Sequence, residues 1–267
     1  MGRVRQTPAS VVARRTVNQS EKNVEGRHVQ RPHAVLDMPS RISKAVKIER
    51  LLKLDESKEQ LRMLEVGTGS GGIAEYFGTH KSGRFSVDSI DVVDIRIAKN
   101  GYSFTLGSGT DLPFADASFD IVISNHVIEH VGNREAQRRH LGELHRVMSA
   151  DGIGYVAVPN RWMLVEPHFK VRFLSWLPRS WRTHYLRFVS DDKDAVYDCE
   201  PLQLLELEQM LAEIGFVAQN LCIEALRETF EIERQTTLST KILRHIPDMV
   251  ICPLRRIIPT LIYRISK

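Results

Sequence analysis

The sequence of 267 residues predicts an α/β fold in which helices cover both faces of a doubly wound, mostly parallel seven-stranded sheet. Two observations lead to this prediction. Short apolar runs typical of strands alternate with amphipathic runs typical of helices, and this alternation is characteristic of parallel sheets. In addition, a glycine-rich turn, EVGTGSGG at 65–72, leads from the first apolar run directly into a helical pattern, as in ligand-binding α/β folds.

Seven segments have the apolar pattern of strands. They are LRMLEV at 61–66, RFSVDSIDVV at 84–93, YSFTL at 102–106, FDIVIS at 119–124, IGYVAV at 153–158, VAQNLCI at 217–223 and TLIYRIS at 260–266. Pro159 ends the fifth strand, because proline cannot donate a ladder hydrogen bond. The last segment alternates apolar and polar residues, which favours an edge strand.

Four segments have the spacing of helices. They lie near 40–53, at 71–80, at 133–152 and at 202–216. Asn133 is the expected N-cap of the third helix, and Gly152 is its expected C-terminal stop. The second helix opens directly from the glycine-rich turn.

The chain is expected to form one domain with additions. Residues 1–33 lack periodicity and predict a flexible basic N-terminal arm, while 34–267 predict the domain itself. Within it, 160–198 interrupts the alternation and holds eight aromatic residues, including all three tryptophans. We interpret this segment as a substrate lid near the carboxyl ends of the strands, the alternative being a local mini-core. A second insertion is expected at 225–258, before the C-terminal edge strand.

Positive charge gathers in three parts of the chain, whose net charge is +4. The basic segments are 1–20, 160–187 and 237–267. Such clusters favour anionic partners such as phosphates or a membrane surface, and a solvated face is the alternative. No specific nucleic acid is expected, and the oligomeric state stays open. The C-terminal segment predicts either a peripheral membrane contact or a connection followed by an edge strand.

The cysteines predict a reducing compartment. Cys199, Cys222 and Cys252 lie far apart without a CxxC pair, so neither a disulfide framework nor a metal site is expected. No apolar run approaches the roughly 20 residues that span a bilayer, and the N-terminus has no apolar signal-peptide region. These features predict a cytoplasmic protein, which would be peripheral at a membrane if its C-terminal segment binds lipid.

The glycine-rich turn fits two ligand-binding templates. Gly67, Gly69 and Gly72 match the dinucleotide pattern GxGxxG. With Gly71, the same turn also matches ExGxGxG, which begins at Glu65. Glycine at such a turn permits unusual dihedral angles and close approach of the backbone to a ligand.

Glu65 discriminates between the two templates. A carboxylate beside a pyrophosphate would repel it by about 1–4 kcal/mol, whereas a ligand with an ammonium and a sulfonium would be attracted. S-adenosylmethionine is such a ligand, because it is cationic, carries a ribose and has no phosphate. The nearby acids Asp91, Asp94 and Asp111 favour the same ligand.

Four motifs in order resemble those of a known family. LEVGTGSGG, SIDVVD, GTDLPFADASFDIVISNHVIEHV and HRVMSADGIGYVAVPN are similar to successive motifs of class I S-adenosylmethionine-dependent methyltransferases, most closely the small-molecule branch with an LPF…SFD…EHV signature. The resemblance covers about 60–160 well and 200–223 loosely. It implies a Rossmann-like methyltransferase fold and methyl transfer to a small-molecule or lipid-linked acceptor, which we expect to receive the methyl group at oxygen.

The resemblance also implies a set of cofactor-binding residues. They are Glu65, Gly67, Thr68, Gly69, Gly71, Asp91, Asp94, Ser108, Gly109, Thr110 and Asn125. Asp91 is the expected ribose ligand, since it follows Ile90 where the second strand should end, and Asp94 is the runner-up. Ser108 stands where many relatives carry an acid, so Ser108, Gly109, Thr110 or the backbone would contact the adenine.

Two histidines are candidate catalytic residues. His126 follows the fourth strand, beside Asn125, where the methyl group would be transferred, and His168 lies in the lid. Each could act as a general base, and a structural role is the alternative for both. His130 is expected to be structural, and Glu129 to brace a neighbouring loop. Arg161 is a candidate contact for an anionic acceptor.

Two other functions remain open. A nicotinamide-dependent oxidoreductase would use the same fold, although Glu65 argues against its pyrophosphate. A non-catalytic regulatory module that binds S-adenosylmethionine is the other alternative, because a fold does not fix a chemistry.

Overall fold

The computed structural model describes residues 37–54, 60–167, 169–191, 193–232, 247, 249 and 252–267. The expected arm at 1–33 and the candidate His168 lie outside these residues. Within the described ranges, no helix combines the length and apolar character needed to cross a membrane.

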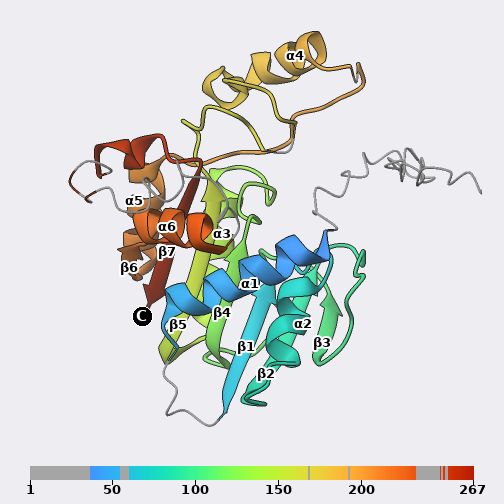
Figure 1. The fold of residues 1–267 in the computed structure, drawn as a ribbon, viewed down its shortest axis with the longest axis vertical. Helices are drawn as coiled ribbons and strands as arrows, with labels where there is room; N and C mark the ends of the chain where they lie inside the picture. The colour runs from blue at the N-terminus through green and yellow to red at the C-terminus, as the bar shows by residue number, and fades with distance from the viewer. Residues whose placement is uncertain are drawn as a thin grey trace, which may run out of the picture. The chain divides into compact units, whose positions relative to one another are not determined.

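The described part of the chain contains a seven-stranded sheet (Figure 1). The strands are β1 (Leu61–Val66), β2 (Phe85–Asp91), β3 (Tyr102–Leu106), β4 (Phe119–Asn125), β5 (Met148–Pro159), β6 (Val217–Asn220) and β7 (Thr260–Ser266). Their order is β3-β2-β1-β4-β5-β7-β6. The first five strands pair in parallel, and β7 is antiparallel to both neighbours. The prediction of a doubly wound, mostly parallel sheet is therefore confirmed.

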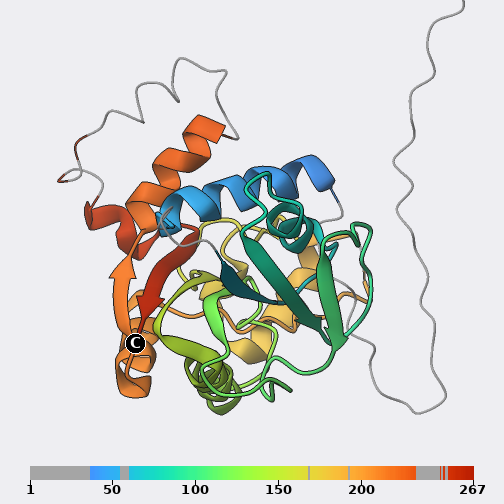
Figure 2. The same cartoon turned by 90° about the horizontal axis from the view of Figure 1, so that it is seen from below.

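Helices cover both faces of this sheet. They are α1 (Met38–Leu52), α2 (Gly72–Gly78), α3 (Arg134–Val147), α5 (Leu204–Ile214) and α6 (Cys222–Ile232). In Figure 2, α1 and α6 lie on one side of the sheet and α3 lies on the other. Asn133 caps α3 as expected, because its side chain accepts a hydrogen bond from the amide of Ala136 at 3.0 Å.

Alternation along each strand supplies two separate cores. Leu64 and Val66 of β1 belong to the cluster that includes α3 and α5. Leu61 and Met63, which precede them at alternate positions, belong to the cluster that includes α1, α2 and α6. A period of two therefore places successive side chains on opposite faces, and both faces are buried.

The expected edge position of the C-terminal strand is wrong. β7 lies between β5 and β6, and β6 forms the edge instead. Leu261, Tyr263 and Ile265 of β7 are buried. The apolar residues of this strand therefore belong to the core and do not form a membrane-binding surface. Most of the preceding C-terminal segment lies outside the described residues.

Two further boundaries differ from the prediction. α3 ends at Val147 rather than at Gly152, because the buried Met148 already pairs with Phe119 as the first residue of β5. The sixth strand ends at Asn220, whose side chain accepts from the amide of Cys222 at 3.1 Å where α6 begins. Residues 225–232, expected to start an insertion, therefore continue a helix that packs on the sheet.

The lid segment at 160–198 contains a 3₁₀ turn, η1 (Leu174–Trp176), and a helix, α4 (Arg179–Val189). In Figure 1, α4 lies beyond the carboxyl ends of the parallel strands. The segment has a small apolar cluster that is separate from the two sheet-facing cores. Its buried members are Leu174, Leu186, Ala195, Tyr197 and Cys199. The lid is thus a unit with its own packing, which accommodates both the lid and the mini-core interpretations.

Candidate functional site

The glycine-rich turn lies where neighbouring strand ends meet. Val66, the last residue of β1, pairs with Ile90 of β2 and with Ser124 of β4. The amides of Gly67 and Thr68 donate to the carbonyl of Ile90 at 2.8 and 3.4 Å. The turn is therefore joined to the end of β2 by backbone hydrogen bonds, at the edge where open α/β sheets bind ligands.

Two glycines of the turn cannot be replaced without rearrangement. Gly67 and Gly71 have φ of 85° and 84°, a left-handed conformation that side chains disfavour. A Cβ on Gly67 would lie 2.2 Å from a methyl carbon of Val127, and one on Gly71 would lie 2.1 Å from the carbonyl oxygen of Ala98. The turn is thus clamped between the segments that follow β4 and β2.

Glu65 places an acid in the interior beside this turn. Its exposed fraction is only 2%. Burial raises the pKa of Glu65 to about 8, and the nearby positive charge of Arg41, on α1, opposes this rise. The amide of Ala74 donates to the carboxyl group, yet Oε2 has no hydrogen-bond partner among the described residues. Near neutral pH the carboxyl group is therefore mostly protonated, and an additional cation or donor would favour its ionised form.

Four buried side-chain oxygens around the turn share this lack of partners within the described residues. They are Glu65 Oε2, Thr68 Oγ1, Ser70 Oγ and Asn125 Oδ1. Buried polar atoms are hydrogen-bonded in the great majority of cases, so a concentration of exceptions calls for an explanation. A polar ligand that supplies several donors at this place would satisfy them.

Asp91 and Asp94 have different environments. Asp91 ends β2, and its two oxygens accept the amides of Gly69 at 2.8 Å and Val92 at 2.7 Å. A carboxylate offers about four lone-pair sites, so it retains two for a ligand. Asp94 is instead held by two hydrogen bonds of 2.8 Å from the guanidinium of Arg96, which lower its pKa well below the ordinary value.

A buried histidine, His140, fixes the 108–110 segment by a hydrogen bond. His140 of α3 contacts the carbonyl oxygen of Gly109 through Nδ1 at 2.7 Å and the hydroxyl of Ser124 through Nε2 at 2.9 Å. A carbonyl accepts, so Nδ1 donates and Nε2 accepts from the serine, as in a neutral imidazole. Burial lowers the pKa of His140, in agreement with the neutral form. Ser108 and Thr110 are joined by their hydroxyls at 2.8 Å.

The segment after β4 contains a histidine–carboxylate pair. His126 has φ of 59°, an uncommon conformation for a residue with a side chain. Its Nδ1 lies 3.2 Å from Oε1 of the fully buried Glu129. Burial would raise the pKa of Glu129, but the hydrogen bond from His126 and the charges of His126 and His130 lower it below the ordinary value. The buried carboxylate therefore orients the imidazole.

His130 joins the same segment to the end of the lid. Its Nδ1 lies 3.8 Å from Sγ of Cys199, and Asp198 is close to both. These three residues could hold a metal ion by distance alone. Burial raises the pKa of the Cys199 thiol, which opposes the thiolate form that metals require. The contact therefore fits a structural role.

The base of the lid is anchored near the strand ends. The amide of Arg161 donates to the carbonyl of Leu202 at 2.9 Å, and the amide of Glu200 donates to the carbonyl of Glu129 at 2.8 Å. Arg161 Nε is buried without a hydrogen-bond partner in the described structure. The candidate His168 lies outside the described residues, so its position relative to His126 is not part of this geometry.

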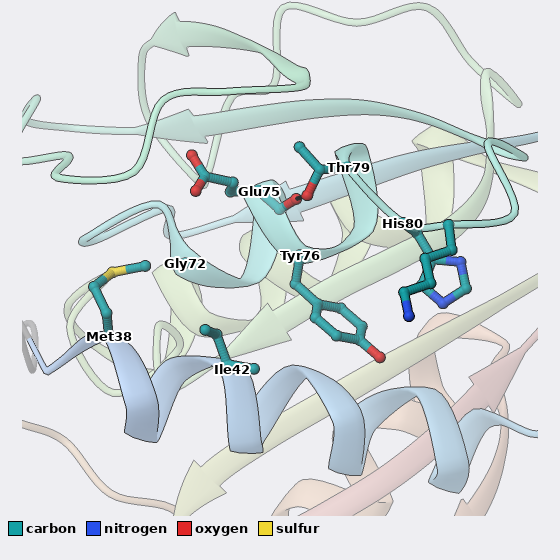
Figure 3. Close-up of a pocket in the computed structure, with 8 residues that line it drawn as sticks. Met38, Ile42, Gly72, Glu75, Tyr76, Thr79 and His80 are labelled. Atoms are coloured by element: carbon teal, nitrogen blue, oxygen red, sulfur yellow. Dashed lines mark hydrogen bonds between the residues drawn. The ribbon is translucent and has the colours of Figure 1, made fainter.

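A cavity of about 330 Å³ opens elsewhere, between α1 and α2 (Figure 3). Met38 and Ile42 of α1 line it together with Tyr76 and His80. The hydroxyl of Tyr76 is satisfied within the protein, because it donates to Glu49 at 2.7 Å. Gly72 is its one lining residue from the glycine-rich turn, so the cavity is distinct from the Glu65–Asp91 site.

Three residues of the site were not singled out in the sequence. Arg41 lies in the amphipathic helix α1, Ser70 occupies a variable position of the glycine pattern, and His140 lies on the inner face of α3. The spacing of His140 with Leu141 and Leu144 marks a buried face, so a polar residue there was a detectable signal. Arg41 gave no such signal, because its proximity to Glu65 depends on how α1 packs.

Comparison with known proteins agrees with this geometry. Residues 64–156 match the model of a family described as a methyltransferase domain. Ajmaline N-methyltransferase of Rauvolfia serpentina is 32% identical over 90 residues, which are 30% of this chain and 31% of that protein. An uncharacterized methyltransferase of Mycolicibacterium gilvum is 40% identical over 91 residues, 33% of this chain and 34% of that protein. The chain thus spans about a third of the length of these relatives.

Solved structures support the fold over a longer range. One chain of the complex between the Trm112 methyltransferase activator of Haloferax volcanii and a second protein has a TM-score of 0.50 at 16% identity, covering 85% of this chain and 93% of that one. The cyclase SpnF also has a TM-score of 0.50, at 14% identity, covering 84% and 80%. Because one of these is described as a cyclase, the fold alone does not fix the chemistry. Residues 64–156 are thus similar to a methyltransferase domain, and this similarity supports S-adenosylmethionine as the cofactor.

Replacement of Glu65 should have opposite effects on ligand binding and on thermal stability near pH 8. Burial raises the pKa of Glu65 from 4.5 to about 8, so its contribution to stability falls as the pH rises between these values. We expect Glu65→Gln to melt at a higher temperature than the wild type at pH near 8, and to differ little at mildly acidic pH. The same variant should bind S-adenosylhomocysteine at least about tenfold more weakly.

Calorimetric titration and thermal melts as a function of pH would measure both effects. Thr79→Ala, an exposed change on the far end of α2, is a control for both. Unchanged affinity of Glu65→Gln, or a lower melting temperature near pH 8, would contradict the role given to this carboxyl group.

Asp91→Ala should weaken S-adenosylhomocysteine binding by at least about tenfold, since charge-assisted hydrogen bonds are worth roughly 1.5–3 kcal/mol each. Asp94→Ala should have a smaller effect, because Arg96 occupies that carboxylate. Titration of both variants tests the order. If Asp94→Ala were the more damaging, the ribose ligand would lie three residues further along the chain.

Proposed function

We propose that this protein transfers the methyl group of S-adenosylmethionine to a small-molecule or lipid-linked acceptor, at an oxygen atom. The observation that carries the proposal is the buried carboxyl group of Glu65 beside a glycine-rich turn. A cation bound there would favour the ionised form of Glu65, which burial disfavours. An ammonium group of the cofactor meets this requirement, and a pyrophosphate does not.

The remaining cofactor contacts follow from the strand ends. The two unused lone pairs of Asp91 would accept the ribose hydroxyls. Val92 directly follows β2, and Leu106 is the last residue of β3. Both side chains are exposed, so they offer apolar surfaces for an adenine beside the 108–110 segment. Arg41, whose positive charge acts on Glu65, would also attract the carboxylate of the cofactor. Together these groups match a ligand with a cationic amino acid end and a nucleoside end.

S-adenosylmethionine, held by Glu65, the glycine-rich turn and Asp91, would supply a methyl group that the acceptor attacks in line with the carbon–sulfur bond, with S-adenosylhomocysteine as the leaving group. The protein contributes position first, because holding two reactants close and aligned accounts for much of the acceleration in such reactions. Asn125 ends β4 and His126 follows it, at the edge of the sheet that carries the glycine-rich turn. Both residues would face the transferred methyl group. His126, oriented through Nδ1 by Glu129, would take the proton of a hydroxyl acceptor.

The two alternatives predict different ligands. A nicotinamide-dependent oxidoreductase would bind NAD through its pyrophosphate, which the acid at Glu65 opposes. A regulatory module would bind S-adenosylmethionine without turnover. The similarity of residues 64–156 to methyltransferase domains favours catalysis over both.

Cofactor choice is the direct test of the proposal. We expect calorimetry to show binding of S-adenosylmethionine and S-adenosylhomocysteine with dissociation constants on the order of micromolar, about −8 kcal/mol, and much weaker binding of NAD. Incubation with labelled S-adenosylmethionine and a panel of hydroxyl, amine and lipid-linked acceptors would then reveal transfer. NAD binding tighter than S-adenosylhomocysteine would refute the proposal.

Replacement of 165–195 by a short Gly/Ser linker should leave S-adenosylhomocysteine affinity within a few-fold and abolish transfer. The cofactor residues lie outside this segment, and the lid would exclude water from the acceptor half of the site. The replacement exposes Tyr197 and Cys199, so Tyr197→Ser with Cys199→Ser should be included to keep the variant soluble. A variant that does not fold would favour the mini-core interpretation, and one that still transfers methyl groups would refute the lid.

A further inference from the structure

Helix α4 of the lid presents its apolar residues outward. Trp181 is 65% exposed and Phe188 is 83% exposed, whereas Arg182 between them is only 2% exposed. The arginine is held by a hydrogen bond from Nε to the carbonyl of Leu177 at 2.9 Å. A helix at the surface of a globular protein normally buries its apolar stripe and exposes its charges, so part of this helix has the reverse arrangement.

The exposed aromatic side chains share one side of the helix. Trp181 and Phe188 are seven residues apart, which is close to two turns, and the exposed His184 lies between them on the same side. Leu186, on the inner side, packs in the small core of the lid. The outward face is therefore a stripe of large apolar side chains that the described part of the protein leaves exposed to solvent.

The segment that carries this stripe is rich in basic residues. Residues 167–190 contain five Lys and Arg residues and no acid. Four of the five are exposed, namely Lys170, Arg172, Arg179 and Arg187. Of these, Arg179 forms an ion pair with Glu200 at 2.9 Å, and the exposed Asp191 follows the segment. Phe173 and Trp176 of the same segment are also exposed. Exposed aromatic residues among mostly basic ones form the pattern of a helix that lies in a membrane interface.

We propose that the outward face of α4, with Trp181 and Phe188 as its apolar anchors, docks on the surface of an anionic lipid bilayer. The aromatic rings would enter the boundary between headgroups and acyl chains, and the basic residues would contact the headgroups. A second copy of the chain is a poorer occupant. A two-fold interface would place the same basic surface against itself, and like charges would oppose it.

The consequence for the reaction rests on the proposed function. The two ends of the lid are fixed beside the strand ends by the hydrogen bonds of Arg161 and Glu200. A bilayer that contacts α4 would therefore lie close to the entrance of the acceptor half of the site. An acceptor held in the membrane by a lipid chain and carrying an anionic headgroup would reach the methyl group without leaving the bilayer.

Vesicle sedimentation tests the docking with the full-length protein. We expect binding to vesicles of phosphatidylcholine mixed with phosphatidylglycerol, and little binding to phosphatidylcholine alone. Trp181→Ser with Phe188→Ser should lower the apparent affinity about tenfold or more. Lys170→Gln with Arg172→Gln should lower it about tenfold and reduce its dependence on salt.

The matched control is Leu205→Ser with Val217→Ser, because these apolar residues are 68% and 67% exposed but lie outside the lid. This control should bind vesicles as the wild type does. Quenching of tryptophan fluorescence by lipids labelled in the acyl chain provides a second measurement on the unmodified protein, and Trp181→Phe should remove most of the quenching.

The outcomes distinguish the docking from the methyl transfer. Equal vesicle binding by the wild type and the Trp181/Phe188 variant, or none by the wild type, would overturn the proposal. A concentration-dependent dimer that this variant abolishes would overturn it in favour of a second copy. The variant should bind S-adenosylhomocysteine with the same affinity as the wild type. If the wild-type protein did not bind S-adenosylhomocysteine, the proposed function would be refuted, and the vesicle measurements would still decide whether α4 docks on a membrane.

Discussion

The structure depends on the burial of one carboxyl group, that of Glu65, at the end of the first strand. An acid in an apolar interior is costly unless it is neutral or paired, and this one has an incomplete set of partners in the described residues. Its cost is tolerated because the strand, the glycine-rich turn and α1 hold it in place from three directions. The fold thus keeps a carboxyl group with a raised pKa at a position where a bound cation would favour its ionised form.

The other features of the site can be understood as supports for this arrangement. The left-handed glycines let the turn pass close to Val127 and Ala98, where a side chain would clash. Asp91 uses one lone pair on each oxygen to fix the turn and its own strand end, and so is oriented before a ligand arrives. His140 does the same for the 108–110 segment. A site whose groups are already oriented loses little entropy on binding.

Local sequence patterns determined most of the fold but not its long-range order. Strand positions, the N-cap Asn133 and the glycine-rich turn depend on neighbouring residues, and all were predictable. The place of β7 between β5 and β6 was not, because alternation of apolar residues suits an edge and an antiparallel inner strand equally. Gly152 suits a helix stop, but the helix ends earlier because Met148 pairs with Phe119, a residue distant in sequence. Within the site, Glu65 and Asp91 stood out by motif, whereas Arg41 depends on the packing of α1.

The separate apolar cluster of the lid has a consequence for how such a protein can diverge. Its members, such as Leu174 and Leu186, are not shared with the two cores that flank the sheet. Changes in distant, independently packed clusters have nearly additive effects on stability. Mutations that reshape the lid can therefore accumulate without loosening the half of the protein that holds the nucleoside. A lineage could change its choice of acceptor in this way while its sheet, and the ligand bound at the strand ends, stay the same.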